Sequence, residues 1–111
     1  MKVDYKDNSQ RILSDLEKGI KIGLEAIGLT AETYAKKATP VCTGRLRNSI
    51  SHTVDGEAAY IGTNVEYAPY VELGTSRAKA HHMLQKAATE HSAEYKRLAE
   101  DAIQSVINNS Q

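Results

Sequence analysis

The chain has 111 residues, with 14 basic and 14 acidic side chains and so no formal net charge at neutral pH. This balance excludes an overall field that would draw the chain onto nucleic acid or an anionic membrane, and no apolar run approaches the roughly 20 residues that span a bilayer. Phe and Trp are absent, so aliphatic side chains and tyrosine must build the core of one domain over residues 1–111, with residues 1–8 and 108–111 frayed.

The first predicted element is a long amphipathic helix over residues 9–38. Its apolar residues recur at helical spacing: Ile12, Leu16, Ile20, Leu24, Ile27, Ala31, Tyr34 and Ala38. At 1.5 Å per residue such a helix is about 45 Å long, which exceeds the roughly 30 Å diameter of a small domain. We therefore expect part of it to project or to pack against another subunit, although it could equally cover the sheet of its own subunit.

Three glycines lie inside this helix, where each costs up to about 1 kcal/mol relative to alanine. Gly19 and Gly23 are one turn apart and could let another backbone approach closely. Gly28 could instead mark a kink, after which Thr30 caps a second short helix.

A β-hairpin is predicted in the middle of the chain. Thr43 can cap a short helical turn over residues 44–48, and the alternation over residues 50–54 then leads to Asp55-Gly56, a strong two-residue turn signal. Such a turn pairs Val54 with Glu57, His52 with Ala59 and Ile50 with Ile61. The predicted buried face therefore carries Ile50, Val54, Ala59 and Ile61, with His52 partly buried.

Two further helices complete a predicted α+β fold with a small antiparallel sheet. Asn64 can cap a short helix that bears Tyr67 and Tyr70, and Gly74 ends it. The C-terminal amphipathic helix is predicted over residues 82–108, because apolar residues alternate steps of four and three: Leu84, Ala88, His91, Tyr95, Leu98, Ala102 and Val106. His91 on this stripe is interpreted as a packing residue.

Charged residues are segregated along the sequence. Residues 36–54 contain basic side chains and no acid (Lys36, Lys37, Arg45, Arg47), whereas residues 55–75 contain acids and no base (Asp55, Glu57, Glu66, Glu72). The two blocks could meet within one subunit across the hairpin, where exposed pairs contribute little. Alternatively, the basic face of one copy meets the acidic face of the next, and head-to-tail contacts of that kind generate rings or filaments.

The chain contains two distinctive segments, PVCTGRLRNSI over residues 40–50 and YIGTNVEYAPYVELGTSRAKA over residues 60–80. A predicted helix that contains Ala and Leu follows the second segment. This combination resembles the phage tail-component family typified by the HK97 gene product ten. The resemblance covers roughly residues 39–88. The chain departs from the family pattern at Cys42, where relatives carry an acid, and at His81-His82-Met83, where relatives carry an Arg-Pro-aromatic step.

The resemblance implies a structural virion protein, a head-tail joining or tail-completion subunit in the neck or tail end of a phage, prophage or phage-derived particle. The expected partners are further copies of the chain in a ring and other phage neck or tail proteins, with DNA only passing through. Assembly would take place in the host cytoplasm. We predict a subunit interface formed by Arg45, Arg47, Glu66, Tyr67, Tyr70 and Glu72, because opposite charges lie within the family-like motifs.

Other functions are less well supported by the residues. A small DNA-binding module could use a basic patch of Arg45, Arg47, Arg77 and Lys79, although no nucleic-acid motif accompanies it. A small hydrolase would need Cys42 as a low-pKa nucleophile, and no histidine is close to it in sequence. His81, His82 and His91 lack the spacing of a metal site. No enzyme activity, cofactor or metal is predicted.

Overall fold

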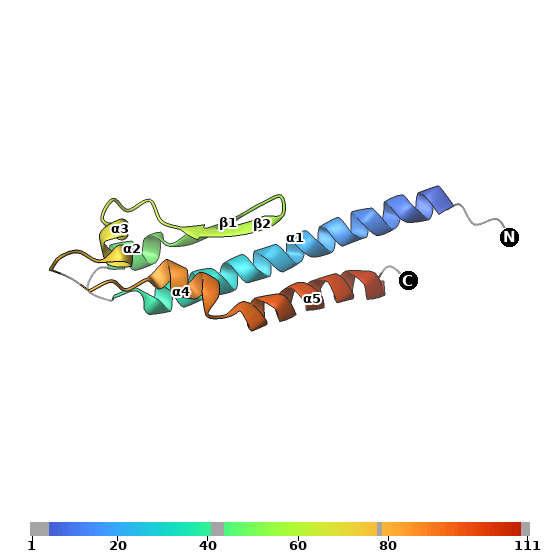
Figure 1. The fold of residues 1–111 in the computed structure, drawn as a ribbon. Helices are drawn as coiled ribbons and strands as arrows, with labels where there is room; N and C mark the ends of the chain where they lie inside the picture. The colour runs from blue at the N-terminus through green and yellow to red at the C-terminus, as the bar shows by residue number, and fades with distance from the viewer. Residues whose placement is uncertain (1–4, 41–43, 78, 110–111) are drawn as a thin grey trace.

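The computed structural model describes residues 5–40, 44–77 and 79–109 (Figure 1). The elements are α1 (Tyr5–Ala38), α2 (Gly44–Ser49), β1 (Ser51–Asp55), β2 (Ala58–Gly62), α3 (Ala68–Leu73), α4 (Met83–Thr89) and α5 (Ser92–Asn109). The predicted α+β fold is confirmed. The molecule is elongated, with extents of 73 × 23 × 21 Å, because α1 runs along most of its length.

Helix α1 is a single unbroken element that begins at Tyr5, four residues before the predicted start. The predicted kink at Gly28 and the cap at Thr30 are wrong. The Thr30 hydroxyl instead donates a hydrogen bond to the Ala26 carbonyl, 2.8 Å away within the same helix. At 1.5 Å per residue its 34 residues extend about 51 Å. The hairpin covers its C-terminal half and α5 runs beside its N-terminal half, so much of α1 packs within its own chain.

Gly19 and Gly23 allow α5 to pack directly on α1. A Cβ atom added at Gly19 would lie 3.3 Å from the Cα of Ile103, and one added at Gly23 would lie 3.3 Å from the Cα of Ala99. These two glycines therefore let another backbone approach closely, as predicted, and that backbone belongs to the same chain. The packing between the helices offsets the low helix propensity of glycine.

The hairpin forms, but its turn lies one residue later than predicted. The register pairs Ser51 with Gly62, His52 with Ile61, Thr53 with Tyr60, Val54 with Ala59 and Asp55 with Ala58. The loop is therefore Gly56-Glu57, and Gly56 takes φ of +60°, which a first loop position in a primed turn requires. Each residue of β1 thus faces a partner two positions beyond the predicted one. A shift of two keeps every side chain on its predicted face, and Ile50 is buried as expected.

Helix α3 starts at Ala68, and the predicted cap at Asn64 is wrong. Tyr67 occupies the N-cap position without a side-chain hydrogen bond. The preceding loop is held instead by Thr63, whose hydroxyl accepts a hydrogen bond from the Val65 backbone N–H at 3.2 Å. Gly74 ends the helix with φ of +78°, as predicted from its position.

The predicted single C-terminal helix is two helices, α4 and α5, which meet at Glu90 and His91. The Thr89 hydroxyl donates a hydrogen bond to the Gln85 carbonyl at 2.8 Å in the last turn of α4. The Tyr95 hydroxyl donates to the carbonyl of Ala87, one of the acceptors that the end of α4 leaves without a helical partner. His91 in the junction stacks on Tyr34, with ring centroids 3.5 Å apart, and so is a packing residue as predicted.

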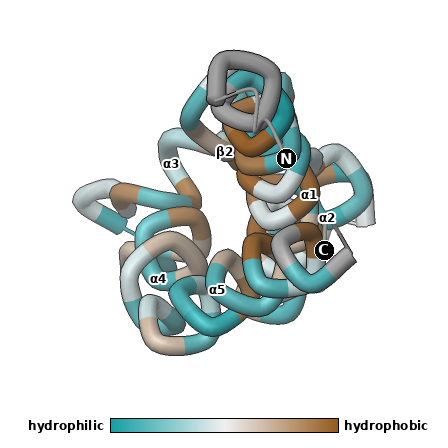
Figure 2. The backbone as a smooth tube through the Cα atoms, turned by 90° about the vertical axis from the view of Figure 1, so that its right-hand side faces the viewer, coloured by the Kyte–Doolittle hydropathy of each residue, from teal (hydrophilic) through white to brown (hydrophobic). Residues whose placement is uncertain are grey.

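The buried core lies where α2, α3 and α4 meet the C-terminal half of α1. One cluster contains Leu46, Val65, Ala68 and Met83, and a second contains Ala35, Ile50 and Ala87. Leu84 packs against both clusters. Figure 2, which looks along the long axis, shows hydrophobic (brown) segments along α1 with α4 and α5 beside it.

The N-terminal half of α1 keeps part of its apolar surface in solvent. Ile12 and Ile20 belong to the predicted buried stripe, yet they are 56% and 41% exposed. The hairpin ends over the middle of α1 (Figure 1), so the hairpin does not cover the stripe beyond that point.

Candidate assembly surface

The structure brings all six predicted interface residues to one end of the molecule. Arg45 and Arg47 lie on α2, Glu66 and Tyr67 lie in the turn before α3, and Tyr70 and Glu72 lie on α3. This end is opposite the start of α1 and the end of α5 (Figure 1). We call the surface formed by α2, the turn before α3 and α3 itself the distal surface.

Arg45 and Glu66 pair within one chain. The guanidinium Nη1 and Nη2 atoms donate to the two Glu66 carboxylate oxygens at 3.2 and 3.0 Å, which is the bidentate arrangement. The guanidinium also lies over the ring of Tyr67, with its carbon 5.7 Å from the centroid. Both side chains of the ion pair are well exposed, so the pair orients the surface more than it stabilises the fold.

The pKa of Glu66 is lowered from its ordinary value. A hydrogen bond from its own backbone N–H is the largest cause, followed by the hydrogen bond and the charge of Arg45. The carboxylate therefore stays charged at neutral pH. It presents a fixed negative group at the distal surface.

Glu72 has a structural role that the sequence reasoning missed. Its two carboxylate oxygens accept hydrogen bonds from the backbone N–H groups of Leu84 at 2.8 Å and Gln85 at 3.0 Å. Helix N-terminal N–H groups lack helical acceptors, and a carboxylate there is favoured by the helix dipole. Glu72 thus caps α4 and ties it to α3. The local sequence contains no signal for this contact, because the cap lies 12 residues before the first N–H that it accepts.

The start of α4 is reinforced by the backbone. His81 donates its backbone N–H to the Val71 carbonyl at 2.9 Å, and His82 donates to the Glu72 carbonyl at 3.0 Å. His82 takes a left-handed conformation with φ of +49° at the N-cap position. This geometry turns the chain into α4 and buries Met83 completely.

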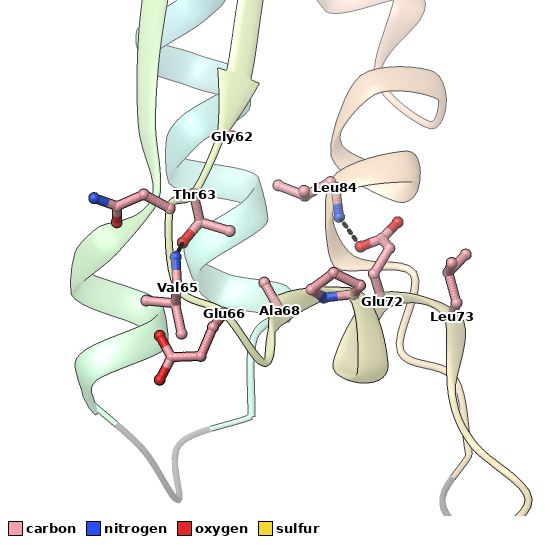
Figure 3. A pocket seen from close by; sticks show the side chains of 10 residues that line it. Gly62, Thr63, Val65, Glu66, Ala68, Glu72, Leu73 and Leu84 are labelled. Atoms are coloured by element: carbon pink, nitrogen blue, oxygen red, sulfur yellow. Dashed lines mark hydrogen bonds between the residues drawn. The ribbon is translucent and has the colours of Figure 1, made fainter.

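An apolar groove of about 470 Å³ opens beside α3 (Figure 3). Its lining comes from the end of β2, the loop before α3, α3 and the start of α4: Gly62, Thr63, Asn64, Val65, Glu66, Ala68, Pro69, Glu72, Leu73 and Leu84. Leu73 at its edge is 70% exposed, and Tyr70 on the same helix is 63% exposed. Large apolar side chains left in solvent beside an apolar groove are typical of protein interaction sites.

The four residues of the alternative basic patch are also exposed. Arg45 and Arg47 lie on α2, and Arg77 and Lys79 lie in the loop between α3 and α4, at the same end of the molecule. Arg45 is engaged by Glu66, so its charge is partly balanced.

The residues considered for catalysis or metal binding do not converge within the described part of the chain. His81 is exposed, His82 is half-buried at the start of α4, and His91 stacks on Tyr34. Across residues 5–40, 44–77 and 79–109 no group of three His, Cys, Asp or Glu side chains is placed to hold a metal ion. Cys42 and the predicted Thr43 cap lie outside the described residues.

A comparison with protein families matches residues 4–74 to the HK97-gp10-like family, described as "Bacteriophage HK97-gp10, putative tail-component". The match spans more than half of the 111 residues. The chain belongs to the HK97-gp10-like family. No curated protein and no solved structure matches it.

Membership in the HK97-gp10-like family places the chain among structural components of phage tails, in the virion. The matched residues include α1, α2, the hairpin and α3, and therefore all six predicted interface residues. A structural family of this kind favours a role in assembly over catalysis. Among the helices described, none has the length and apolar character needed to cross a membrane.

Proposed function

We propose that this HK97-gp10-like protein is a neck or tail-end subunit that acts by assembling into a ring of identical copies, and that it joins the head to the tail or completes the tail. The observation that carries the proposal is the distal surface. There the family-matched segment leaves Tyr70 and Leu73 of α3 in solvent, and Leu73 lines an apolar groove.

The contact that we propose joins two different patches of the distal surface, the arginines of α2 in one copy and the acids in and before α3 in the next, since a head-to-tail contact can close into a ring. Tyr70 would be buried near the centre of the seam, where aromatic side chains commonly contribute most of the binding energy. Burying a side chain of this size stabilises a complex by roughly 1.5–3 kcal/mol.

Charged residues would set the orientation of neighbouring copies. Arg45 of one copy would exchange its own Glu66 for the Glu66 of its neighbour, which keeps the bidentate geometry and leaves no carboxylate unpaired. Arg47 is exposed two positions further along α2 and would approach the Glu66 or Glu72 of the neighbour. Because Glu72 already accepts two backbone hydrogen bonds, its contact with an arginine would add to the cap and not replace it.

Charge reversal tests the proposal. The double variant Arg45→Glu, Arg47→Glu should reduce the particle mass measured by light scattering while the circular dichroism spectrum is retained. The matched control is Arg77→Glu, Lys79→Glu, which makes the same change of charge at the same end and should leave the mass unchanged. A second variant, Tyr70→Ala, alters no ion pair and should also lower the mass. Unchanged mass in both distal variants would contradict the proposed interface.

The alternative is a small DNA-binding module that uses the basic patch, favoured by the exposure of its four residues at one end. In that case both double variants should abolish a salt-sensitive shift of DNA by the protein. The assembly proposal expects no such shift at physiological salt, with DNA passing the ring without specific recognition.

A further inference from the structure

His52 on β1 is held between two carboxylates of α1. Its Nδ1 lies 3.2 Å from Oε1 of Glu32, and its Nε2 lies 3.3 Å from Oε2 of Glu25. Glu25 and Glu32 are seven residues apart and so lie on the same face of the helix. The His52 side chain is 21% exposed, and that of Glu32 is 16% exposed. One imidazole thus bridges two turns of α1 and attaches the hairpin to it.

Gly28 provides the space in which this ring lies. A Cβ atom at position 28 would be 2.7 Å from Cδ2, 3.2 Å from Cγ and 3.3 Å from Cβ of His52. The imidazole therefore packs on the backbone of α1, between the two glutamates. The helix includes a residue of low helix propensity at the position where the ring needs contact with the backbone.

The geometry selects the protonation state of the ring. A neutral imidazole has one N–H donor and one nitrogen with a lone pair, whereas the imidazolium has two donors. With a carboxylate oxygen near each nitrogen, a neutral ring would direct its lone pair at a negatively charged oxygen. Only the imidazolium can donate to both Glu25 and Glu32.

The other charges around the ring support the same state. Lys36 lies 3.4 Å from the second oxygen of Glu32 on α1, so two carboxylates face one ammonium and the imidazole. From β2, the residue paired with His52 is Ile61, and the neighbouring Ala59 on the same face is also uncharged. With His52 protonated, the two negative and two positive charges balance. With His52 neutral, one negative charge remains uncompensated, and Glu32 has less access to solvent than Glu25, whose side chain is 53% exposed.

We propose that His52, Glu25, Glu32 and Gly28 form a proton-dependent latch, which holds the hairpin on α1 when His52 is an imidazolium and loosens it when His52 loses that proton. Histidine is the side chain whose charge ordinarily changes between pH 5 and 8. The latch therefore makes the attachment of the hairpin stronger in mildly acidic solution than in mildly alkaline solution. This inference does not depend on the proposed ring.

Glu32 sets the acid limit of the latch. Burial raises the pKa of Glu32, but hydrogen bonds and attraction from His52 and Lys36 outweigh burial, and the pKa is lowered from 4.5. A carboxyl whose pKa is lower in the folded state stabilises the fold above the unfolded value, and this contribution is lost as the pH falls through the folded value. Attachment of the hairpin should consequently weaken in acid, as the pH falls through the lowered pKa of Glu32.

The latch can be tested on the full-length chain by hydrogen exchange of the β2 amides, with each observed rate divided by the intrinsic rate at that pH. In the native protein the opening constant of the hairpin should rise roughly tenfold between about pH 5.5 and 8, the loss expected for one charged hydrogen bond. In His52→Gln the opening constant should be nearly independent of pH over that range. The control His81→Gln, at an exposed histidine, should retain the native pH dependence.

The ring nitrogens give a second readout that does not require a variant to fold. Nitrogen NMR of the labelled native protein should show two protonated ring nitrogens at His52 in mildly acidic solution. Glu25→Gln removes one of the two charges that favour the imidazolium and should weaken the signal of the doubly protonated ring at a given pH. A neutral His52 in the folded protein near pH 5.5, or an identical pH dependence in His52→Gln and the native chain, would overturn the proposal.

Discussion

Replacing Gly28 by alanine tests how the hairpin is seated, because two effects of opposite sign act at this position. Alanine is favoured over glycine within a helix by about 1 kcal/mol. Against this, its Cβ would lie 2.7 Å from Cδ2 of His52, closer than unstrained atoms approach. The ring cannot simply rotate away, because both nitrogens are engaged by glutamates on either side. Overpacking of this kind typically costs roughly 1–3 kcal/mol.

We predict that the effect of Gly28→Ala on the free energy of unfolding differs in sign between two backgrounds. In the native background Gly28→Ala should leave the stability unchanged or lower it by up to about 2 kcal/mol, the overpacking cost less the gain in propensity. In a His52→Ala background the same substitution should raise the stability by up to about 1 kcal/mol, because the ring that it would strike is gone and only the contact with the Cβ atom of residue 52, at 3.3 Å, remains. The free energies of unfolding of the four proteins, measured in urea, complete the double-mutant cycle.

A stabilising Gly28→Ala in the native background would refute this reasoning, since it would mean that the ring does not pack on the helix. Equal effects in the two backgrounds would refute it as well. Gly44→Ala is a useful control, because among the described residues the nearest atom to an added Cβ there is Nδ2 of Asn48, 3.9 Å away.

Three further predictions concern packing, capping and titration. Met83→Ala removes a side chain that is completely buried and should cost about 2–5 kcal/mol in urea denaturation, whereas Leu73→Ala, at a residue 70% exposed, should change the stability of the monomer by less than about 0.5 kcal/mol. Glu72→Ala removes the carboxylate that caps α4 and should cost about 1 kcal/mol, with faster hydrogen exchange at the Leu84 and Gln85 amides. The pKa of Tyr34 is raised, mainly because its hydroxyl donates to Glu94, so Glu94→Gln should lower it in an ultraviolet titration.

Each of these predictions has an outcome that would contradict it. A large loss in Leu73→Ala and a small loss in Met83→Ala would mean that the core lies elsewhere. Unchanged amide exchange in Glu72→Ala would mean that water replaces the cap without loss. A Tyr34 pKa that is unaffected by Glu94→Gln would assign the rise to burial, which is the second cause acting on that hydroxyl.

The family-like motifs contain residues whose roles differ from what their charges indicate. The acids over residues 55–75 form an uninterrupted block in the sequence, yet Glu66 pairs with Arg45 and Glu72 caps α4 in the same chain. The segregation of charge predicted that the basic and acidic blocks attract each other, but it did not determine which residues form ion pairs. The proposal of a subunit interface now rests mainly on exposed Tyr70 and Leu73 and on the groove beside them.

Local signals in the sequence determined the long first helix, the hairpin, the short helix ended by Gly74 and the placing of His91 on a packed face. These features depend on periodicity and on turn residues, which act over a few positions. The face of each hairpin residue was also determined, because alternation survives a shift of two residues in the register.

Tertiary structure alone decided which surfaces these elements cover. The role of Gly28 depends on a ring 24 residues away, and the cap of α4 depends on a glutamate from α3. The break between α4 and α5 leaves the Ala87 carbonyl without a helical hydrogen bond, and the Tyr95 hydroxyl donates to it. The periodicity of the sequence does not indicate this break. Contacts of this kind combine residues that are distant in the chain, and their energies arise only when packing has brought the partners together.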